Sequence, residues 1–317
     1  MKIAKLRGAH DFVIENMESP KIGKNECLIK VKACGVCHSE IDQWANTLSN
    51  LEYPRFIGHE VSGEIIQVGS QVEKFNPGDR VAVWVDQKGY ASEVAVASER
   101  IFPIDDSVSF EEAMAEPLSC TTNGVIEADI ELADTVALVG TGFMGLILLQ
   151  QIKLKGATKV IAIDIRDDIL EVATQLGADV TLNPNRVNIE KWVKKITDGK
   201  GVDAAFEVGG KQATLDLTSK IIRMEGKLII FGYHPGRREI EDLGYWNWMA
   251  FKLINAHFRN MKTILQGADI GIKLLNSGKV QMKPLITHTF PLEEIEKAFQ
   301  AAKNKPEGFI KSVITFR

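Results

Sequence analysis

The sequence predicts an α/β protein with two domains: a compact, barrel-like β domain and a doubly wound parallel sheet. Three observations support this prediction. The chain has 317 residues, which is enough for two domains. Roughly the first 120 residues are rich in short alternating apolar runs with Gly and Pro turns. Farther along, strand-like and helix-like patterns alternate, as they do in a parallel sheet covered by helices.

Short strands are expected throughout the first domain. Residues 27–34 (CLIKVKAC) alternate apolar with polar side chains, as a half-buried strand does, and 61–69 and 80–85 read in the same way. The NPGD tetrapeptide at 76–79 predicts a turn between two of these strands. The run ASEVAVASERIFPI at 91–104 continues the strand pattern. Many short strands separated by such turns favour a barrel.

The pattern changes near residue 120. Residues 109–130 have helical spacing with acidic residues early, and 135–156 read as a β-branched strand, a glycine turn and a long helix. An apolar strand at 159–165 follows, and VDAAFEVGG (202–210) and GKLIIFGYH (226–234) supply further strands with helices between them. This alternation predicts a parallel, doubly wound sheet.

The C-terminal part returns to a mixed pattern. Its expected elements are a helix over 267–280 stopped by Gly278, a strand over 284–290, a helix over 291–304 and a last strand over 308–316. The last strand is able to pair with the N-terminal domain, which would make that domain discontinuous. We therefore expect one domain from 1–119 and 263–317, and a dinucleotide-binding domain from 120–262.

Composition excludes several classes of partner. The net charge is −4 and the pI about 5.9, and no basic stripe is present to hold phosphates, so we expect no nucleic-acid partner. The longest apolar runs, such as LIIF at 228–231, are too short to span a bilayer, and MKIAKLRGAH lacks the apolar segment of a signal peptide. A cytoplasmic location without membrane association is the resulting expectation.

The stretch VALVGTGFMG indicates a dinucleotide site. Gly140, Gly142 and Gly145 have the G-x-G-x-x-G spacing, in which the glycines allow a tight turn, close approach of the pyrophosphate and close helix packing. The motif follows a strand and opens a helix, whose N-terminus attracts phosphate. A helix–strand turn without a ligand is the alternative. The expected cofactor contacts are Gly140, Gly142, Phe143, Met144, Gly145, Asp164, Arg166 and Gly232.

Asp164 decides the expected cofactor. It ends the strand after the glycine turn, where a carboxylate accepts hydrogen bonds from both ribose hydroxyls and repels a 2′-phosphate. We therefore expect NAD rather than NADP, although Arg166, two residues later, works against a strict preference.

The octapeptide ACGVCHSE at 33–40 is open to three interpretations. A redox disulfide would open a helix, whereas this motif ends a strand. A structural zinc site needs four protein ligands, and no second Cys-x-x-Cys exists. A catalytic zinc site needs about three ligands and an open position. Candidate ligands are Cys37, His59, Glu60 and Glu116, each of which has an ordinary structural explanation when taken alone.

Together these motifs resemble the zinc-dependent medium-chain alcohol and polyol dehydrogenases. The resemblance covers essentially the whole chain, and the order and spacing of its motifs are specific. That family combines a GroES-like β-barrel catalytic domain with a Rossmann domain. The motifs are CGVCHSE (34–40), GHEVSGEI (58–65), FNPGDRVAV (75–83), EPLSC (116–120), VGTGFMG (139–145) and ITHTFPLEEIEKAF (286–299).

The resemblance implies a set of zinc ligands. Cys37 and His59 match two ligands, and Glu60 matches an acid that binds zinc directly at some stages. Glu116 matches the third protein position, which is glutamate in the sorbitol dehydrogenase branch and there acts directly or through a water. Cys34 is then structural. No cysteine lobe follows the RVAV strand, so we expect one zinc per chain and no structural zinc.

The resemblance also implies catalytic roles. Ser39 matches the hydroxyl that accepts the substrate's proton, and Glu40 matches a carboxylate that hydrogen-bonds the histidine ligand. The chain departs from the family at two positions. Asp42 stands where the distal proton relay is often histidine, and His38 stands where an arginine lies near the cofactor phosphates.

The expected activity is hydride transfer between NAD(H) and a secondary alcohol, polyol or sugar-type substrate, with zinc as Lewis acid. The alternative is an NAD-binding protein with Cys34 and Cys37 as a thiol switch. A homo-oligomer, dimer or tetramer, is expected. The segment 232–251 either lines a polar, aromatic substrate pocket or packs in an interface. Its candidate side chains are Tyr233, His234, Arg237, Arg238, Trp246 and Trp248.

Overall fold

The computed structural model describes residues 1–48 and 50–316, and the chain divides into two compact units. The first unit comprises Met1–Ser119 and Ile264–Arg317, and the second comprises Cys120–Thr263. Helices α2 (Ala115–Glu127) and α8 (Met261–Asn276) each contain one of the boundaries. Among the described residues, no helix is both long and apolar enough to cross a bilayer.

The first unit is built on a seven-stranded sheet and a separate hairpin. The sheet has the order β14-β15-β3-β4-β5-β7, with β6 also paired to β3. The sheet strands are β3 (Glu26–Gly35), β4 (Glu60–Val68), β5 (Arg80–Trp84), β6 (Glu93–Ala97), β7 (Ile101–Pro103), β14 (Ile286–Pro291) and β15 (Lys311–Thr315). The hairpin consists of β1 (Lys2–Gly8) and β2 (Asp11–Asn16).

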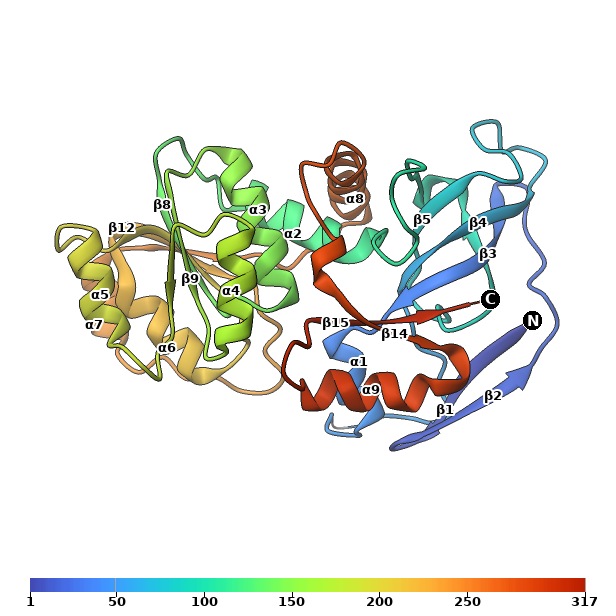
Figure 1. The fold of residues 1–317 in the computed structure, drawn as a ribbon, viewed down its shortest axis with the longest axis horizontal. Helices are drawn as coiled ribbons and strands as arrows, with labels where there is room; N and C mark the ends of the chain where they lie inside the picture. Colours follow the sequence, from blue (N-terminus) through green and yellow to red (C-terminus); the bar gives the residue numbers. More distant parts are fainter. Residues whose placement is uncertain (49, 317) are drawn as a thin grey trace. The chain divides into compact units, whose positions relative to one another are not determined.

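Segments from the two ends of the chain lie side by side in this sheet. Strand β15 pairs antiparallel with β3, with Val313 opposite Gly35 and Ile314 opposite Cys34. Figure 1 shows the red C-terminal strands beside the blue β3. The last strand therefore belongs to the sheet of the N-terminal region.

Aromatic packing seals the core of this unit between α1 (His38–Trp44) and α9 (Ile295–Asn304). The ring of Phe299 lies 5.7 Å from the rings of both Trp44 and Tyr90, and all three side chains are fully buried. The indole of Trp44 donates to Glu296 Oε2 at 2.8 Å, so its polar nitrogen is satisfied despite burial. This packing holds α1, which carries several candidate site residues.

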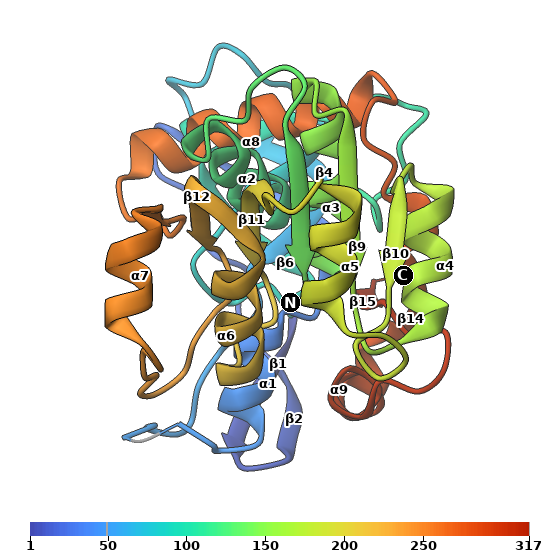
Figure 2. The same cartoon turned by 90° about the vertical axis from the view of Figure 1, so that its left-hand side faces the viewer.

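The second unit is a parallel six-stranded sheet with the order β10-β9-β8-β11-β12-β13. This is the doubly wound order in which the direction of winding reverses between the first and fourth strands, here β8 and β11. Figures 1 and 2 show α3 and α4 on one side of the sheet, and α5 and α6 on the other. The α/β class, with a β-rich unit and a doubly wound parallel sheet, is confirmed.

The elements of this unit alternate along the chain as βαβ crossovers require. They are β8 (Thr135–Val139), α3 (Phe143–Lys155), β9 (Lys159–Ile163), α4 (Asp167–Gln175), β10 (Val180–Leu182), α5 (Ile189–Ile196), β11 (Val202–Glu207), α6 (Gln212–Ile221), β12 (Ile222–Ile230), α7 (Leu243–Met249) and β13 (Lys252–Asn255).

Several element bounds differ from the sequence prediction. The helix expected over 109–130 begins only at Ala115, because Pro117 is tolerated in the first turn of a helix but not in its interior. The strand pattern over 91–104 is broken by a 3₁₀ turn at Ser98–Arg100. The helix expected over 267–280 begins earlier, at Met261, and ends at Asn276.

Candidate functional site

Three side chains with different donor atoms converge where β3 and β4 meet. Among the described residues, Cys37, His59 and Glu60 form a group whose ligand atoms all lie within 4.8 Å of one another. Cys37 lies two residues beyond the end of β3 and is the N-cap residue of α1. Glu60 is the first residue of β4 and pairs with Gly35. The sheet register thus brings residues more than 20 positions apart to one point.

Glycine at position 35 is required by the position of Glu60. A Cβ on Gly35 would lie 1.9 Å from Glu60 Oε2 and 2.8 Å from Met114 Sδ. No side chain fits in that space without displacing the carboxylate. The G of CGVC therefore has a packing reason: it leaves room for the acid beside the cysteine.

Glu60 is buried and paired with a buried lysine. Lys311 Nζ, on β15, lies 2.8 Å from Glu60 Oε1 and 2.6 Å from Oε2, and both side chains are about as buried as core residues. Only the contact to Oε1 has hydrogen-bond geometry, so Oε2 is a buried oxygen without a hydrogen-bond partner. Burial raises the pKa of Glu60, and the Lys311 ammonium opposes that rise without cancelling it.

His59 is held by a buried carboxylate. Its Nδ1 lies 2.7 Å from Glu40 Oε1, which also accepts from the backbone N–H of Gly58 at 2.7 Å. The other oxygen of Glu40 accepts from the Tyr90 hydroxyl at 2.5 Å. Burial alone would raise the pKa of Glu40, but the charge of His59 and these donors outweigh it and lower that pKa. Because Glu40 occupies Nδ1, the ring presents Nε2 as its other donor atom.

The protonation of His59 reflects the same neighbours. Burial acts to lower the pKa of His59, but the negative charges of Glu40 and Cys37 outweigh it. The pKa of His59 consequently lies well above its usual value in the protein alone.

The remaining candidate catalytic residues lie along α1. The Ser39 hydroxyl donates to Cys37 Sγ at 3.3 Å, which places it beside the group of three. Asp42 Oδ1 accepts from the Thr47 hydroxyl at 2.9 Å, while Asp42 Oδ2 is a buried oxygen without a hydrogen-bond partner. His38 begins the helix and is exposed.

Glu116 lies outside the group of three. It is in the first turn of α2, and its negative charge is one of the influences that raise the pKa of Glu60. The structure therefore brings together Cys37, His59 and Glu60, with Glu116 as a neighbouring charge.

The donor set fits zinc. Thiolate, imidazole and carboxylate are the three ligand types that zinc takes in proteins, and a catalytic zinc site needs three protein ligands and one open position. The unpartnered Oε2 of Glu60 is an acceptor that a cation would satisfy. The hydrogen bond between Glu40 and His59 is the outer support that zinc-binding histidines usually have.

The two cysteines of the Cys-x-x-Cys do not behave as a redox pair. Both thiols are free, and Cys34 is fully buried in β3. Burial raises the pKa of Cys34 well above its usual value, with further contributions from Glu40 and Glu60. A thiol held in this way is a poor nucleophile.

In the second unit, the glycines have the geometry of the fingerprint. Gly140 has φ +96°, and a Cβ on Gly145 would lie 2.5 Å from Gly140 O, so turn and helix touch through bare backbone. A Cβ on Gly142 would meet open space, and Gly142 caps α3 without a side-chain hydrogen bond. The N-terminus of α3, which begins with Phe143 and Met144, is therefore open to an anion.

Asp164 lies where the ribose is expected. It follows β9, and its carboxylate accepts from the backbone N–H groups of Thr141 at 2.8 Å and Arg166 at 3.1 Å. The guanidinium of Arg166 forms an ion pair with Asp168. Gly232 follows β12 and lies in the first residues of the segment that was a candidate substrate pocket.

Of the candidate side chains in that segment, two polar ones are held by hydrogen bonds within the second unit. Arg238 donates to His234 Nδ1, and His234 Nε2 lies against the Glu207 carboxylate. Trp246 packs on Phe251 with ring centroids 5.2 Å apart. Trp248, by contrast, is 75% exposed.

Sequence reasoning missed Lys311, Tyr90 and Glu207. A lysine in the otherwise apolar run GFIKSVITF was the available signal for Lys311. Nothing in the sequence marks Tyr90 or Glu207 as partners of Glu40 and His234.

Comparisons with known proteins identify families and relatives that this chain is similar to. The family described as alcohol dehydrogenase GroES-like domain matches residues 23–126, and the family described as zinc-binding dehydrogenase matches residues 144–267. Sorbitol dehydrogenase of Bacillus subtilis is 32% identical, covering 95% of this chain and 93% of that protein. D-arabitol-phosphate dehydrogenase of Enterococcus avium is 30% identical, covering 92% and 91%. L-threonine 3-dehydrogenase of Pyrococcus abyssi is 29% identical, covering 96% of each.

Solved structures show the same fold. 2R,3R-butanediol dehydrogenase from Bacillus subtilis superposes with a TM-score of 0.86 at 25% identity, covering 100% of this chain and 99% of that one. Galactitol-1-phosphate dehydrogenase from Escherichia coli superposes with a TM-score of 0.89 at 22% identity, covering 100% of both chains.

Proposed function

Because this chain belongs to the zinc-dependent medium-chain dehydrogenase family, we propose that it transfers a hydride between NAD(H) and a secondary alcohol of the polyol or sugar type. The observation that carries the proposal is the convergence of Cys37, His59 and Glu60, in which one buried oxygen of Glu60 has an ion-pair contact with Lys311 but no hydrogen bond. A thiol switch is not favoured, because Cys34 is buried and its pKa is raised.

One zinc ion per chain is part of the proposal. Cys37 and His59 would hold it, together with Glu60 or Glu116, either directly or through a water. When bound, zinc supplies a Lewis acid that makes an alcohol oxygen more acidic. Two of the four cysteines, Cys27 and Cys34, are buried in β3, which leaves too few thiols for a second site of four cysteines.

In this proposal, residues of the chain orient the His59 ring and accept the substrate's proton. Glu40 fixes the His59 ring through Nδ1, and Tyr90 fixes Glu40. Ser39, whose hydroxyl lies beside Cys37, is the proposed first acceptor of the substrate's proton. The unpartnered Oδ2 of Asp42 is an acceptor one helical turn farther along, which supports Asp42 as the second relay position. His38, exposed at the start of α1, is proposed to face the cofactor phosphates.

NAD is the proposed cofactor. Asp164 carries a negative charge at the ribose end of the glycine turn, where a 2′-phosphate would be repelled. Arg166, the cation best placed by sequence to attract that phosphate, is already paired with Asp168. The proposed contacts are Gly140, Gly142, Phe143, Met144, Gly145, Asp164, Arg166 and Gly232.

The proposed substrate class rests on the relatives. Their names specify sorbitol, an arabitol phosphate, galactitol 1-phosphate, a butanediol and threonine, each of which carries a secondary alcohol. A carboxylate in place of a thiolate among the zinc ligands is the feature of this chain that matches the sorbitol branch.

The test combines metal analysis with a substrate panel. The purified protein should contain about one zinc per chain, and NAD reduction should be faster with polyols, polyol phosphates or threonine than with primary alcohols. A double variant, Cys37→Ala with His59→Ala, should lose both zinc and activity. Preference for simple primary alcohols would exclude the polyol class. Undiminished oxidation by the double variant would exclude the metal mechanism.

We also propose that the protein is a homo-oligomer, a dimer or tetramer. Edge strand β13 is paired only with β12 among the described residues, and apolar side chains around it face outward. Leu253 is 54% exposed, Leu243 is 58% exposed and Trp248 is 75% exposed. Exposed apolar side chains beside an unpaired edge are typical of an interface. Light scattering of the wild type and of Leu253→Lys tests this: the variant should shift toward monomer.

A further inference from the structure

A buried carboxylate in the second unit has polar partners that the proposed reaction does not use. Glu207 ends β11 and is fully buried. Its Oε1 accepts from the backbone N–H of Gly210 at 2.7 Å and from the Thr214 hydroxyl. Its Oε2 lies 2.6 Å from His234 Nε2. A charge buried this deeply persists in a fold only when its partners are fixed.

The partner of His234 on its other side determines the tautomer. Arg238 Nε donates to His234 Nδ1 at 3.1 Å. Because a guanidinium can only donate, Nδ1 must be the acceptor, and the network assigns the single ring proton to Nε2, which donates to Glu207. The three side chains therefore form a hydrogen-bond network with one direction. The Arg238 cation donates to the neutral ring of His234, and that ring donates to the Glu207 carboxylate.

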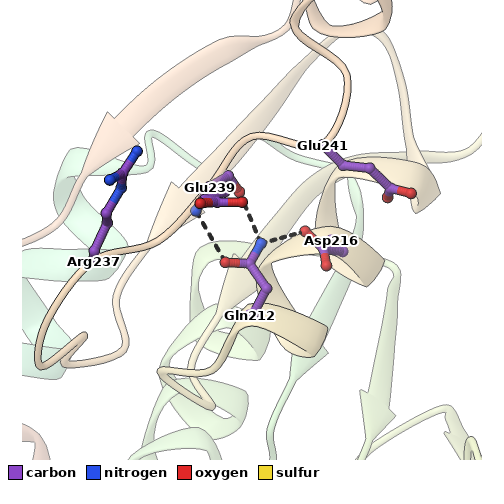
Figure 3. A pocket seen from close by; sticks show the side chains of 5 residues that line it. All are labelled: Gln212, Asp216, Arg237, Glu239 and Glu241. Atoms are coloured by element: carbon purple, nitrogen blue, oxygen red, sulfur yellow. Dashed lines mark hydrogen bonds between the residues drawn. The ribbon is translucent and has the colours of Figure 1, made fainter.

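This hydrogen-bond network joins two loops at the same edge of the sheet. Arg238 Nη2 donates to Gly210 O at 2.9 Å, so the segment after β12 is joined to the loop after β11. A second joint lies beside it: the Gln212 amide donates to Glu239 O at 2.8 Å and accepts from Glu239 N at 3.0 Å (Figure 3). The surface pocket at this joint is lined by Gln212, Asp216, Arg237, Glu239 and Glu241.

The fastened loops touch the glycine turn. A Cβ on Gly140 would lie 2.8 Å from Gly209 N, and Gly209 N donates to Val139 O at 3.2 Å. A Cβ on Gly232 would lie 2.6 Å from Gly210 N and 2.7 Å from Glu207 Oε2. Three backbone segments thus meet through their glycines, at the point where the sheet order reverses.

The position of this contact assigns it to one half of a dinucleotide. A dinucleotide crosses a doubly wound sheet at the reversal point, with one mononucleotide on each half. Asp164, which follows β9, marks the adenosine half over β8, β9 and β10. The loops after β11 and β12 therefore belong to the other half.

We propose that Arg238, His234 and Glu207 are positioning residues for the nicotinamide half of the cofactor. They act by holding Gly209, Gly210 and Gly232 against the glycine turn, and they contact no reacting atom themselves. This inference rests on the proposed NAD site. It predicts that disrupting these hydrogen bonds weakens binding of the whole dinucleotide and leaves binding of its adenosine half unchanged.

The test compares NADH with ADP-ribose, which lacks the nicotinamide. Binding is measured by fluorescence for NADH and by calorimetry for ADP-ribose. His234→Phe removes both hydrogen bonds and should weaken NADH binding about tenfold, the cost of leaving a buried acceptor unsatisfied. Binding of ADP-ribose should not change. His234→Gln should restore NADH binding, because its amide oxygen accepts from Arg238 and its NH₂ group donates to Glu207.

Another ion pair of the second unit offers a matched control. Asp203 and Arg223 form an ion pair at 2.7 Å that bridges the same two strands, β11 and β12, at their opposite ends. Arg223→Met should lower stability and leave the binding of both ligands unchanged. If His234→Phe fails to fold, Arg238→Met decides, since it removes the donor to His234 Nδ1 and the donor to Gly210 O, and it should weaken NADH binding in the same direction.

The outcomes separate this inference from the proposed function. Wild-type protein that binds neither NADH nor ADP-ribose contradicts the NAD site itself. Wild-type protein that binds both, with a His234→Phe variant that binds NADH equally well, contradicts only the positioning role. Equal loss of both ligands, or an equal loss of NADH in Arg223→Met, also overturns that role, because the effect would then be general loosening of the unit.

Discussion

Replacing Gly35 by alanine should weaken zinc binding although it changes none of the proposed ligands. The new Cβ would lie 1.9 Å from Glu60 Oε2, whereas ordinary contact begins at 3.4 Å, so the carboxylate must retreat by the difference, about 1.5 Å. The backbone of Gly35 is not in the left-handed region, so the effect comes from this clash and from the smaller one with Met114 Sδ at 2.8 Å. A ligand moved this far no longer lies within reach of the same ion.

Two magnitudes follow from this displacement. Overpacking of a filled core costs about 1–3 kcal/mol, so the free energy of unfolding in urea should fall by that amount. Loss of a correctly held carboxylate near the metal should weaken zinc binding about 10–100-fold, measured by competition with a chromophoric chelator. Both effects should appear in the same variant, because the buried pair of Glu60 and Lys311 is disturbed together with the metal group.

The matched control is Gly8→Ala. Gly8 belongs to the same unit, and a Cβ there would meet nothing within 4 Å. This variant should keep wild-type zinc affinity and stability. If Gly35→Ala binds zinc as tightly as Gly8→Ala, then Glu60 does not take part in the metal site at rest, and the reasoning from its position is refuted.

Three further predictions concern the cofactor, the metal and pH. Asp164→Ser should narrow the preference for NADH over NADPH about tenfold in binding assays, because it removes the charge that repels a 2′-phosphate; an unchanged ratio would assign the preference elsewhere. Removing zinc with a chelator should lower the free energy of unfolding by about 4 kcal/mol relative to protein with zinc at about 1,000 times its Kd; an unaltered melting curve would argue against a bound ion. Burial raises the pKa of Asp134 above its usual value, so the folded state disfavours its charged form and stability falls as pH rises through that pKa. Asp134→Asn, whose amide oxygen still accepts from Glu131 N, should therefore gain stability relative to wild type between pH 4 and pH 7 in urea titrations; a constant difference would contradict this.

Local patterns in the sequence predicted the sheet of the second unit and the glycine turn, because the signal for each lies within one βαβ unit. The N-terminal hairpin was missed. Its turn uses His10 at φ 55° in place of the Asn-Gly or Gly-Gly pairs that mark such turns. The helical spacing over 109–130 predicts a helix that extends beyond both ends of α2. Pro117 is the signal for the later start, because proline is tolerated only in the first turn of a helix.

In the candidate site, the sequence predicted the ligand types and Glu40 as the partner of His59, but it did not predict Lys311 or Tyr90. Cys37, His59 and Glu60 stand in motifs whose order can be read directly. The burial of Lys311 depends on the pairing of β15 with β3, which joins residues almost 280 positions apart. The contact between Glu207 and His234 depends in the same way on two strand ends that meet only in the folded sheet.

The two units share one arrangement of a buried carboxylate, a glycine and a basic side chain. In each, a buried carboxylate lies against a glycine whose Cβ would strike it: Gly35 against Glu60, and Gly232 against Glu207. In each, a basic side chain from a distant segment supplies the partner, Lys311 in one case and His234 in the other. Burying a charge costs free energy unless hydrogen-bond partners are held in position around it. The same hydrogen bonds restrain those partners. We infer that these carboxylates hold the backbone at the proposed metal and dinucleotide sites, and that apolar replacements of equal size would preserve folding better than they preserve binding.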